Sequence, residues 1–102
     1  MELNILIDMV SKKFPKEELY VLTSQIKRAG DSIVLNIGEG SQGQSNLEFA
    51  RFLNYSNRSC IEVVCCIYIA KSRNIITEDD FTNVYSKCET LVKMLQSLKN
   101  KL

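Results

Sequence analysis

Residues 81–102 read FTNVYSKCETLVKMLQSLKNKL and repeat an apolar side chain at alternating steps of three and four residues. The repeating positions are Phe81, Val84, Cys88, Leu91, Leu95, Leu98 and Leu102. A seam with this period predicts a helix that packs along its length against other helices at a shallow angle. Thr77 and Asp80 have the spacing of a capping box, so we expect this helix to begin at Thr77.

Three further helical segments precede this one. We expect the first from Glu2 to Lys13, because Phe14 stands before Pro15 and is pushed out of helical geometry. The second runs from Pro15 to residues 38–40, where glycine can adopt a left-handed cap. The third opens at Ser45, which forms a capping-box pattern with Glu48. Their seams are Leu3, Leu6, Ile7 and Val10; Leu19, Leu22, Ile26, Ala29, Ile33 and Asn36; and Phe49, Leu53, Ser56, Cys60, Val63, Ile67 and Ala70.

The connections near residues 40–45 and 72–77 are short, and short connections make consecutive helices antiparallel. The chain has one proline and four glycines among 102 residues, which favours long helices over a strand-and-turn fold. The sequence therefore predicts one all-α domain over residues 1–102. We expect an antiparallel up-down-up-down four-helix bundle with a shortened first helix.

The composition argues against several function classes. Histidine is absent, which removes the commonest general base and metal ligand, so we expect no enzyme, cofactor or metal. The four cysteines, Cys60, Cys65, Cys66 and Cys88, match no zinc or C-x-x-C pattern, and we interpret them as small buried apolar residues in a reducing cytoplasm. No secretory signal or membrane-spanning stretch is apparent. Residues 38–43 match G-x-G-x-x-G, but a helix precedes them, so we read them as a cap and turn.

A polar cluster is expected between the second and third helices, because Asn36 falls on an apolar seam and a buried amide needs hydrogen-bond partners. Its candidate members are Ser32, Asn36, Glu39, Ser59 and Glu62. In one interpretation the cluster fixes helix register, as a core asparagine does in coiled coils. In the other, its carboxylates form a metal or substrate site. We favour the structural interpretation.

Two surfaces are candidates for binding. Around residues 60–70 the apolar character of the third helix spreads beyond one face, more than a small subunit can cover. We therefore expect Ile61, Val64, Tyr68 and Ile69 to contact another subunit. The basic residues Lys12, Lys13, Lys16, Lys27, Arg28, Arg51 and Arg58 form either solvated helix faces or a phosphate-binding surface. The net charge of +1 favours solvated faces.

The sequence also resembles a known family. The resemblance is carried by Phe14–Tyr20, Leu22–Ile26, Arg28–Ala29, Ser32–Ile33, Asn36–Ile37, Glu39–Gly40, Glu48–Phe49, Arg51–Leu53, Ser59, Glu62 and Lys93–Leu95. These residues are similar to those of the bundle proteins encoded by intervening sequences inside bacterial 23S ribosomal RNA genes. They are also similar to the related accessory variability determinant of diversity-generating retroelements.

The resemblance implies a non-catalytic bundle that assembles as a ring, typically a homopentamer, and serves as an assembly or adaptor protein. It also implies a second possibility, binding to RNA or DNA together with a reverse transcriptase partner. The family's first helix is usually longer than the one expected here.

Overall fold

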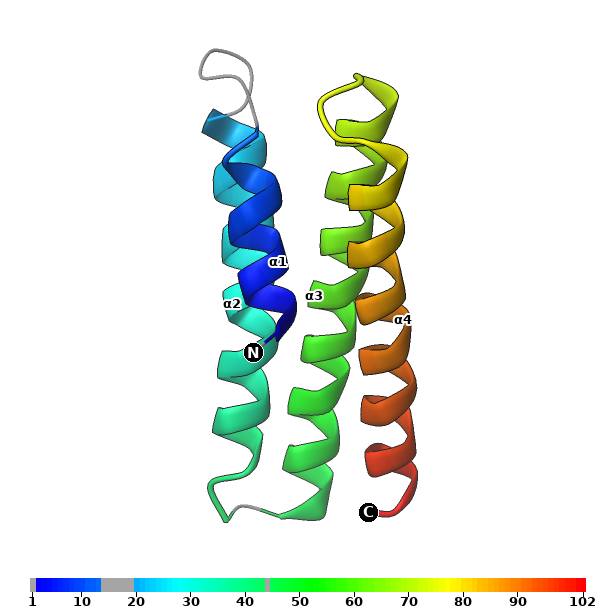
Figure 1. The fold of residues 1–102 in the computed structure, drawn as a ribbon. Coiled ribbons are helices and arrows are strands. Elements are labelled where there is room, and N and C mark those ends of the chain that lie inside the picture. The colour runs from blue at the N-terminus through cyan, green and yellow to red at the C-terminus, as the bar shows by residue number, and fades with distance from the viewer. Residues whose placement is uncertain (1, 14–19, 44) are drawn as a thin grey trace.

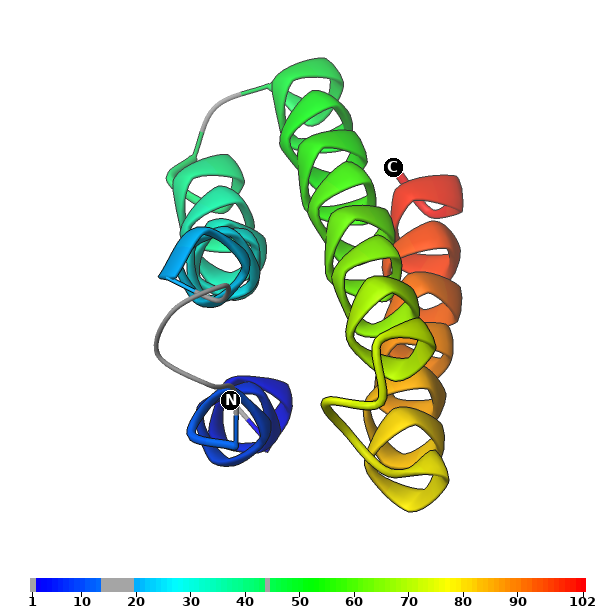
Figure 2. The ribbon, with the colours of Figure 1, turned by 90° about the horizontal axis from the view of Figure 1, so that it is seen from above.

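The computed structural model describes residues 2–13, 20–43 and 45–102, and these residues form four helices. The helices are α1 (Glu2–Ser11), α2 (Tyr20–Gly40), α3 (Asn46–Ser72) and α4 (Glu78–Asn100), with no strand in the described ranges. Both α2 and α4 pack against α3 and against α1 (Figures 1 and 2). The predicted all-α, antiparallel four-helix bundle is confirmed.

The predicted helix starts at Ser45 and Thr77 are confirmed by their cap geometry. The Ser45 hydroxyl accepts a hydrogen bond from the Glu48 backbone N–H at 3.1 Å. The Thr77 hydroxyl accepts from the Asp80 N–H at 3.0 Å, and the Asp80 carboxylate accepts from the Thr77 N–H at 3.2 Å. Each cap satisfies backbone donors that the first turn of a helix leaves without partners.

The glycine-rich end of α2 differs from the prediction. The helix ends at Gly40, but Gly38 and Gly40 are helical, and the left-handed residue is Gly43 with a φ of 83°. The reason for glycine at position 40 is space, since an added Cβ would lie 2.8 Å from Phe52 Cβ and 2.9 Å from Phe49 Cδ1. Gly40 therefore allows α2 and α3 to approach each other closely.

The core follows the predicted seams over most of the bundle. The buried seam residues are Leu3, Ile7, Val10, Leu22, Ile26, Ala29, Ile33, Leu53, Ser56, Cys60, Val63, Ile67, Ala70, Phe81, Val84, Cys88 and Leu95. The prediction that the seam of the last helix packs along its whole length is wrong at the C-terminal end, where Leu98 and Leu102 are each 38% exposed.

The length of α1 explains this exposed end. The ten residues of α1 span about 15 Å, whereas the 27 residues of α3 span about 40 Å at 1.5 Å per residue. Within the described residues, no helix covers the part of the bundle between α2 and α4 that lies beyond the N-terminal end of α1 (Figure 1).

Two predictions about the helix ends have different outcomes. The first helix ends at Ser11 rather than Lys13, and the predicted start of the second helix at Pro15, with Leu19, lies outside the described residues.

Within the described ranges, no helix combines the length and apolar character needed to cross a bilayer.

Candidate interaction surface

The outer side of α3 carries large apolar side chains in contact with water. The exposed fractions are 60% for Ile61, 53% for Tyr68 and 40% for Ile69, and Val64 is half-buried. Tyr68 also packs edge-on against the buried ring of Phe81 on α4, with ring centroids 4.8 Å apart. Ile61, Val64 and Tyr68 therefore lie on the side of α3 that borders α4. Ile69 lies on the outer face of the helix, farther from α4, since at about 100° per residue it is close to the direction of Glu62.

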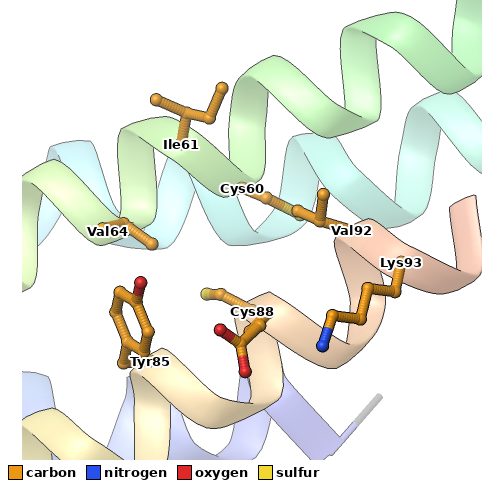
Figure 3. A pocket seen from close by; sticks show the side chains of 8 residues that line it. Cys60, Ile61, Val64, Tyr85, Cys88, Val92 and Lys93 are labelled. Atoms are coloured by element: carbon orange, nitrogen blue, oxygen red, sulfur yellow. The ribbon is translucent and has the colours of Figure 1, made fainter. Parts of the chain in front are cut away.

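A groove with a volume of about 320 Å³ lies on the surface between α3 and α4, and Ile61 and Val64 form part of its lining (Figure 3). Its lining consists of Cys60, Ile61, Val64, Tyr85, Cys88, Glu89, Val92 and Lys93. The first three come from α3 and the others from α4. We call this feature the α3–α4 groove.

The sequence explains why the groove is hollow. Cys60 and Cys88 occupy facing seam positions, are 0% and 1% exposed, and are smaller than the leucines found elsewhere in the seams. Burial raises the pKa of the Cys60 thiol to about 11 and that of Cys88 to about 12, so both remain neutral at physiological pH. The floor of the groove is therefore uncharged and apolar.

The mouth of the groove carries the polar groups. Tyr85, Glu89 and Lys93 succeed one another at steps of four residues along α4, with Tyr85 37% exposed. Lys93 forms no ion pair with any described residue. The sequence prediction missed the α4 side of the groove. Tyr85, Glu89 and Val92 each directly follow a seam residue, so a helical projection of α4 would have placed all three on one side of the seam.

The predicted polar cluster is smaller than expected. Asn36 Nδ2 donates to the carbonyl oxygen of Ser32 at 2.8 Å and to its Oγ at 3.0 Å, and Ser59 Oγ donates to Ser32 Oγ at 2.9 Å. The fully buried Ser56 also joins the two helices, since its Oγ donates to the Ile33 carbonyl at 2.9 Å. These small hydroxyl side chains connect α2 to α3 at close range.

The two carboxylates do not belong to this cluster, so their inclusion in the prediction was wrong. Glu39 is exposed, and Glu62 is exposed and lies 3.4 Å from the Arg28 guanidinium. Arg28 precedes Glu39 by eleven residues, which is about 16 Å of helix, so the carboxylates lie at different levels of the bundle. Among the described residues, no three acidic or cysteine side chains come together in a way that could hold a metal ion.

One of the four cysteines is not buried. Cys60, Cys66 and Cys88 are buried as predicted, but Cys65 is exposed, because it lies on the outer side of α3. All four are free thiols. Burial, with a contribution from Glu62, raises the pKa of the Cys66 thiol to about 11.

Several of the candidate basic residues are neutralised by nearby acids. Lys13 Nζ lies 2.8 Å from the Asp80 carboxylate, and Arg51 lies 3.0 Å from Glu48. Burial alone would raise the pKa of the Asp80 carboxyl, but hydrogen bonds from Lys13 and Thr77 outweigh it and hold the pKa below its ordinary value. Paired cations have less potential to attract phosphate.

Among the described residues, the remaining basic candidates form no such ion pairs, apart from Arg28, which lies 3.4 Å from Glu62. Lys12, Lys27 and Arg58 are exposed and form no ion pair with a described residue, while Lys16 lies outside the described ranges. Lys13 and Arg51 lie near opposite ends of a molecule 44 Å long, as their contacts with the first turns of α4 and α3 require. Lys13 and Arg51 therefore cannot belong to one compact basic patch of a single chain.

The fold and these surfaces define an all-α four-helix bundle with an apolar groove on its outer side. The profile of the family described as 23S rRNA-intervening sequence protein matches residues 1–97. The chain belongs to this family.

One solved structure is similar over nearly the whole chain. It is the crystal structure of a protein of unknown function from the S23 ribosomal protein family of Bacteroides thetaiotaomicron. The two chains share 26% sequence identity with a TM-score of 0.87, over 96% of this chain and 92% of the other. No curated protein matches the chain.

Proposed function

We propose that this protein is a non-catalytic assembly module that binds further copies of itself through the outer side of α3 and the α3–α4 groove, and forms a ring. The observation that carries the proposal is the exposure of Ile61 and Tyr68 beside a groove with an apolar floor, together with exposed Ile69 on the outer face of the same helix. Contiguous apolar surface of this kind on a small soluble protein marks an interaction site. The family resemblance favours five subunits.

The alternative use of this surface, as an enzyme site, has little chemical support. The chain contains no histidine, the groove thiols are neutral, and its one carboxylate, Glu89, stands at the mouth and not over a polar cavity. A groove of this kind suits an apolar side chain from a neighbouring protein. We place the assembly in the cytoplasm, where free thiols such as these four persist.

The test is the mass of the purified protein and of one variant, measured by light scattering and sedimentation. Ile61→Glu places a charge on the groove wall and is expected to convert the assembly to monomers with unchanged helical circular dichroism. Leu47→Glu is the matched control, because Leu47 is 79% exposed in the first turn of the same helix, where an acid is favourable. A wild-type protein that is monomeric at micromolar concentration refutes the proposal.

Nucleic-acid binding is the second candidate function, and the exposed cations Lys12, Lys27 and Arg58, which form no ion pair with a described residue, are what favour it. Lys12, Lys27 and Arg58 would supply the phosphate contacts, and a ring would repeat each of them around its surface. A gel shift with RNA and DNA over a salt series tests this function. No shift at low salt rules it out, whereas a shift that weakens steeply with salt and is reduced by Arg58→Glu supports it.

A further inference from the structure

We infer that the α3–α4 groove of one copy binds the opposite side of the bundle of the next copy, where α1 and α2 lie side by side. This inference rests on the proposed self-assembly and adds which two surfaces meet. Seen along the bundle, α1 and α2 lie on one side and α3 and α4 on the other (Figure 2). Contact between two different surfaces makes the interface heterologous, the type that builds rings.

The side of the bundle where α1 meets α2 has its own exposed apolar residues. Val34 and Leu35 are 42% and 70% exposed, and they line a shallow hollow together with Asn4 and Asp31. We call these four residues the α1–α2 surface. If the groove paired with a second groove about a two-fold axis, this surface would stay in water. Pairing groove with α1–α2 surface covers both apolar regions in every copy.

Shape also favours unlike surfaces. Two grooves placed face to face would have to fill two hollows of about 320 Å³ each from their own rims. Leu35 projects into solvent with most of its side chain free, and a leucine suits the apolar floor between Cys60 and Cys88. The projecting residue of one surface and the hollow of the other are therefore complementary.

Charge gives the contact a direction. The groove mouth carries Lys93, which has no ion-pair partner among the described residues, and the α1–α2 surface carries the exposed carboxylate of Asp31. The one described contact of that carboxylate is a hydrogen bond of 3.4 Å from Asn4. Asp31 can therefore accept from Lys93 of the next copy while Leu35 enters the groove.

The first test is a mixing experiment with two variants that are each defective in one surface. Ile61→Glu blocks the groove and Leu35→Glu blocks the α1–α2 surface, so each variant alone is expected to be monomeric. An equimolar mixture is expected to give a two-chain species and nothing larger, because one functional surface of each kind remains. Helical circular dichroism of both variants checks that they are folded.

The second test exchanges the charges. Asp31→Lys and Lys93→Asp are each expected to weaken assembly about tenfold, as an interface pair replaced by like charges would. The double variant restores it. If Leu35→Glu assembles like the wild type, or the mixture remains monomeric, the pairing of surfaces is wrong. Self-assembly itself would still stand if Ile61→Glu alone broke it, so the two failures are distinguishable.

Discussion

Replacing Gly40 with alanine tests the close packing of α2 on α3. An alanine Cβ at this position would lie 2.8 Å from Phe52 Cβ and 2.9 Å from Phe49 Cδ1. Carbon atoms in favourable contact are about 3.5–4.0 Å apart, so the helices would have to separate by roughly 1 Å. Phe52 cannot escape by changing rotamer, because the contact involves its Cβ, which the helix backbone fixes.

The expected magnitude is a difference between two opposing effects. Overpacking in a tight site costs about 1–3 kcal/mol. The higher helix propensity of alanine returns at most about 1 kcal/mol, and less at the last residue of a helix. We therefore expect Gly40→Ala to lower the free energy of unfolding by about 1–2 kcal/mol, which for a chain of this size lowers Tm by roughly 5–15 °C.

Gly38→Ala is the matched control, because beyond its chain neighbours and the backbone of its own helix nothing lies within 4 Å of the added Cβ. This variant is expected to gain up to about 1 kcal/mol from helix propensity alone. Both variants are to be compared with the wild type by urea and thermal unfolding at one protein concentration, since self-association makes Tm depend on concentration. A Gly40→Ala protein as stable as the Gly38→Ala protein would contradict the close approach described here.

Three further predictions concern single side chains. Because the pKa of Asp80 is lowered in the folded state, its contribution to stability is present above the ordinary carboxyl pKa and disappears as the pH falls through the folded value. Asp80→Asn should flatten this acid limb of a stability–pH profile, and an unchanged limb would exclude Asp80 as its source. Iodoacetamide at pH 8 should label Cys65 in the native monomeric Ile61→Glu variant and the other three cysteines only in urea, as peptide mass spectrometry can report. Labelling of a buried thiol at the same rate would contradict the described burial. Ser59→Ala removes the hydrogen bond to Ser32 and should cost about 1 kcal/mol in urea unfolding, whereas no loss would mean that this bond adds nothing to stability.

The positions of the helices and most of the core followed from the sequence, because both depend on local patterns. A seam such as Leu53, Val63 and Ile67 repeats within one helix, and a cap such as Thr77 acts on the residues directly after it. Periodicity and capping need no knowledge of the partner helix. The same local reasoning indicated that Ile61 and Tyr68 exceed what the bundle can bury.

Features that depend on contacts between helices were decided by the tertiary structure. Glu62 lies beside the seam in sequence, but in the structure it pairs with Arg28 at the surface. The way α2 is aligned along α3 brings Glu62 next to Arg28. Leu98 belongs to an uninterrupted apolar seam and is still exposed, because α1 is too short to reach the C-terminal part of α4 and cover it. The α3–α4 groove needs α3 and α4 placed side by side, with Cys60 and Cys88 facing each other. The sequence pattern of a single helix cannot reveal the separation between Cys60 and Cys88, since that separation exists only once α3 and α4 have packed together.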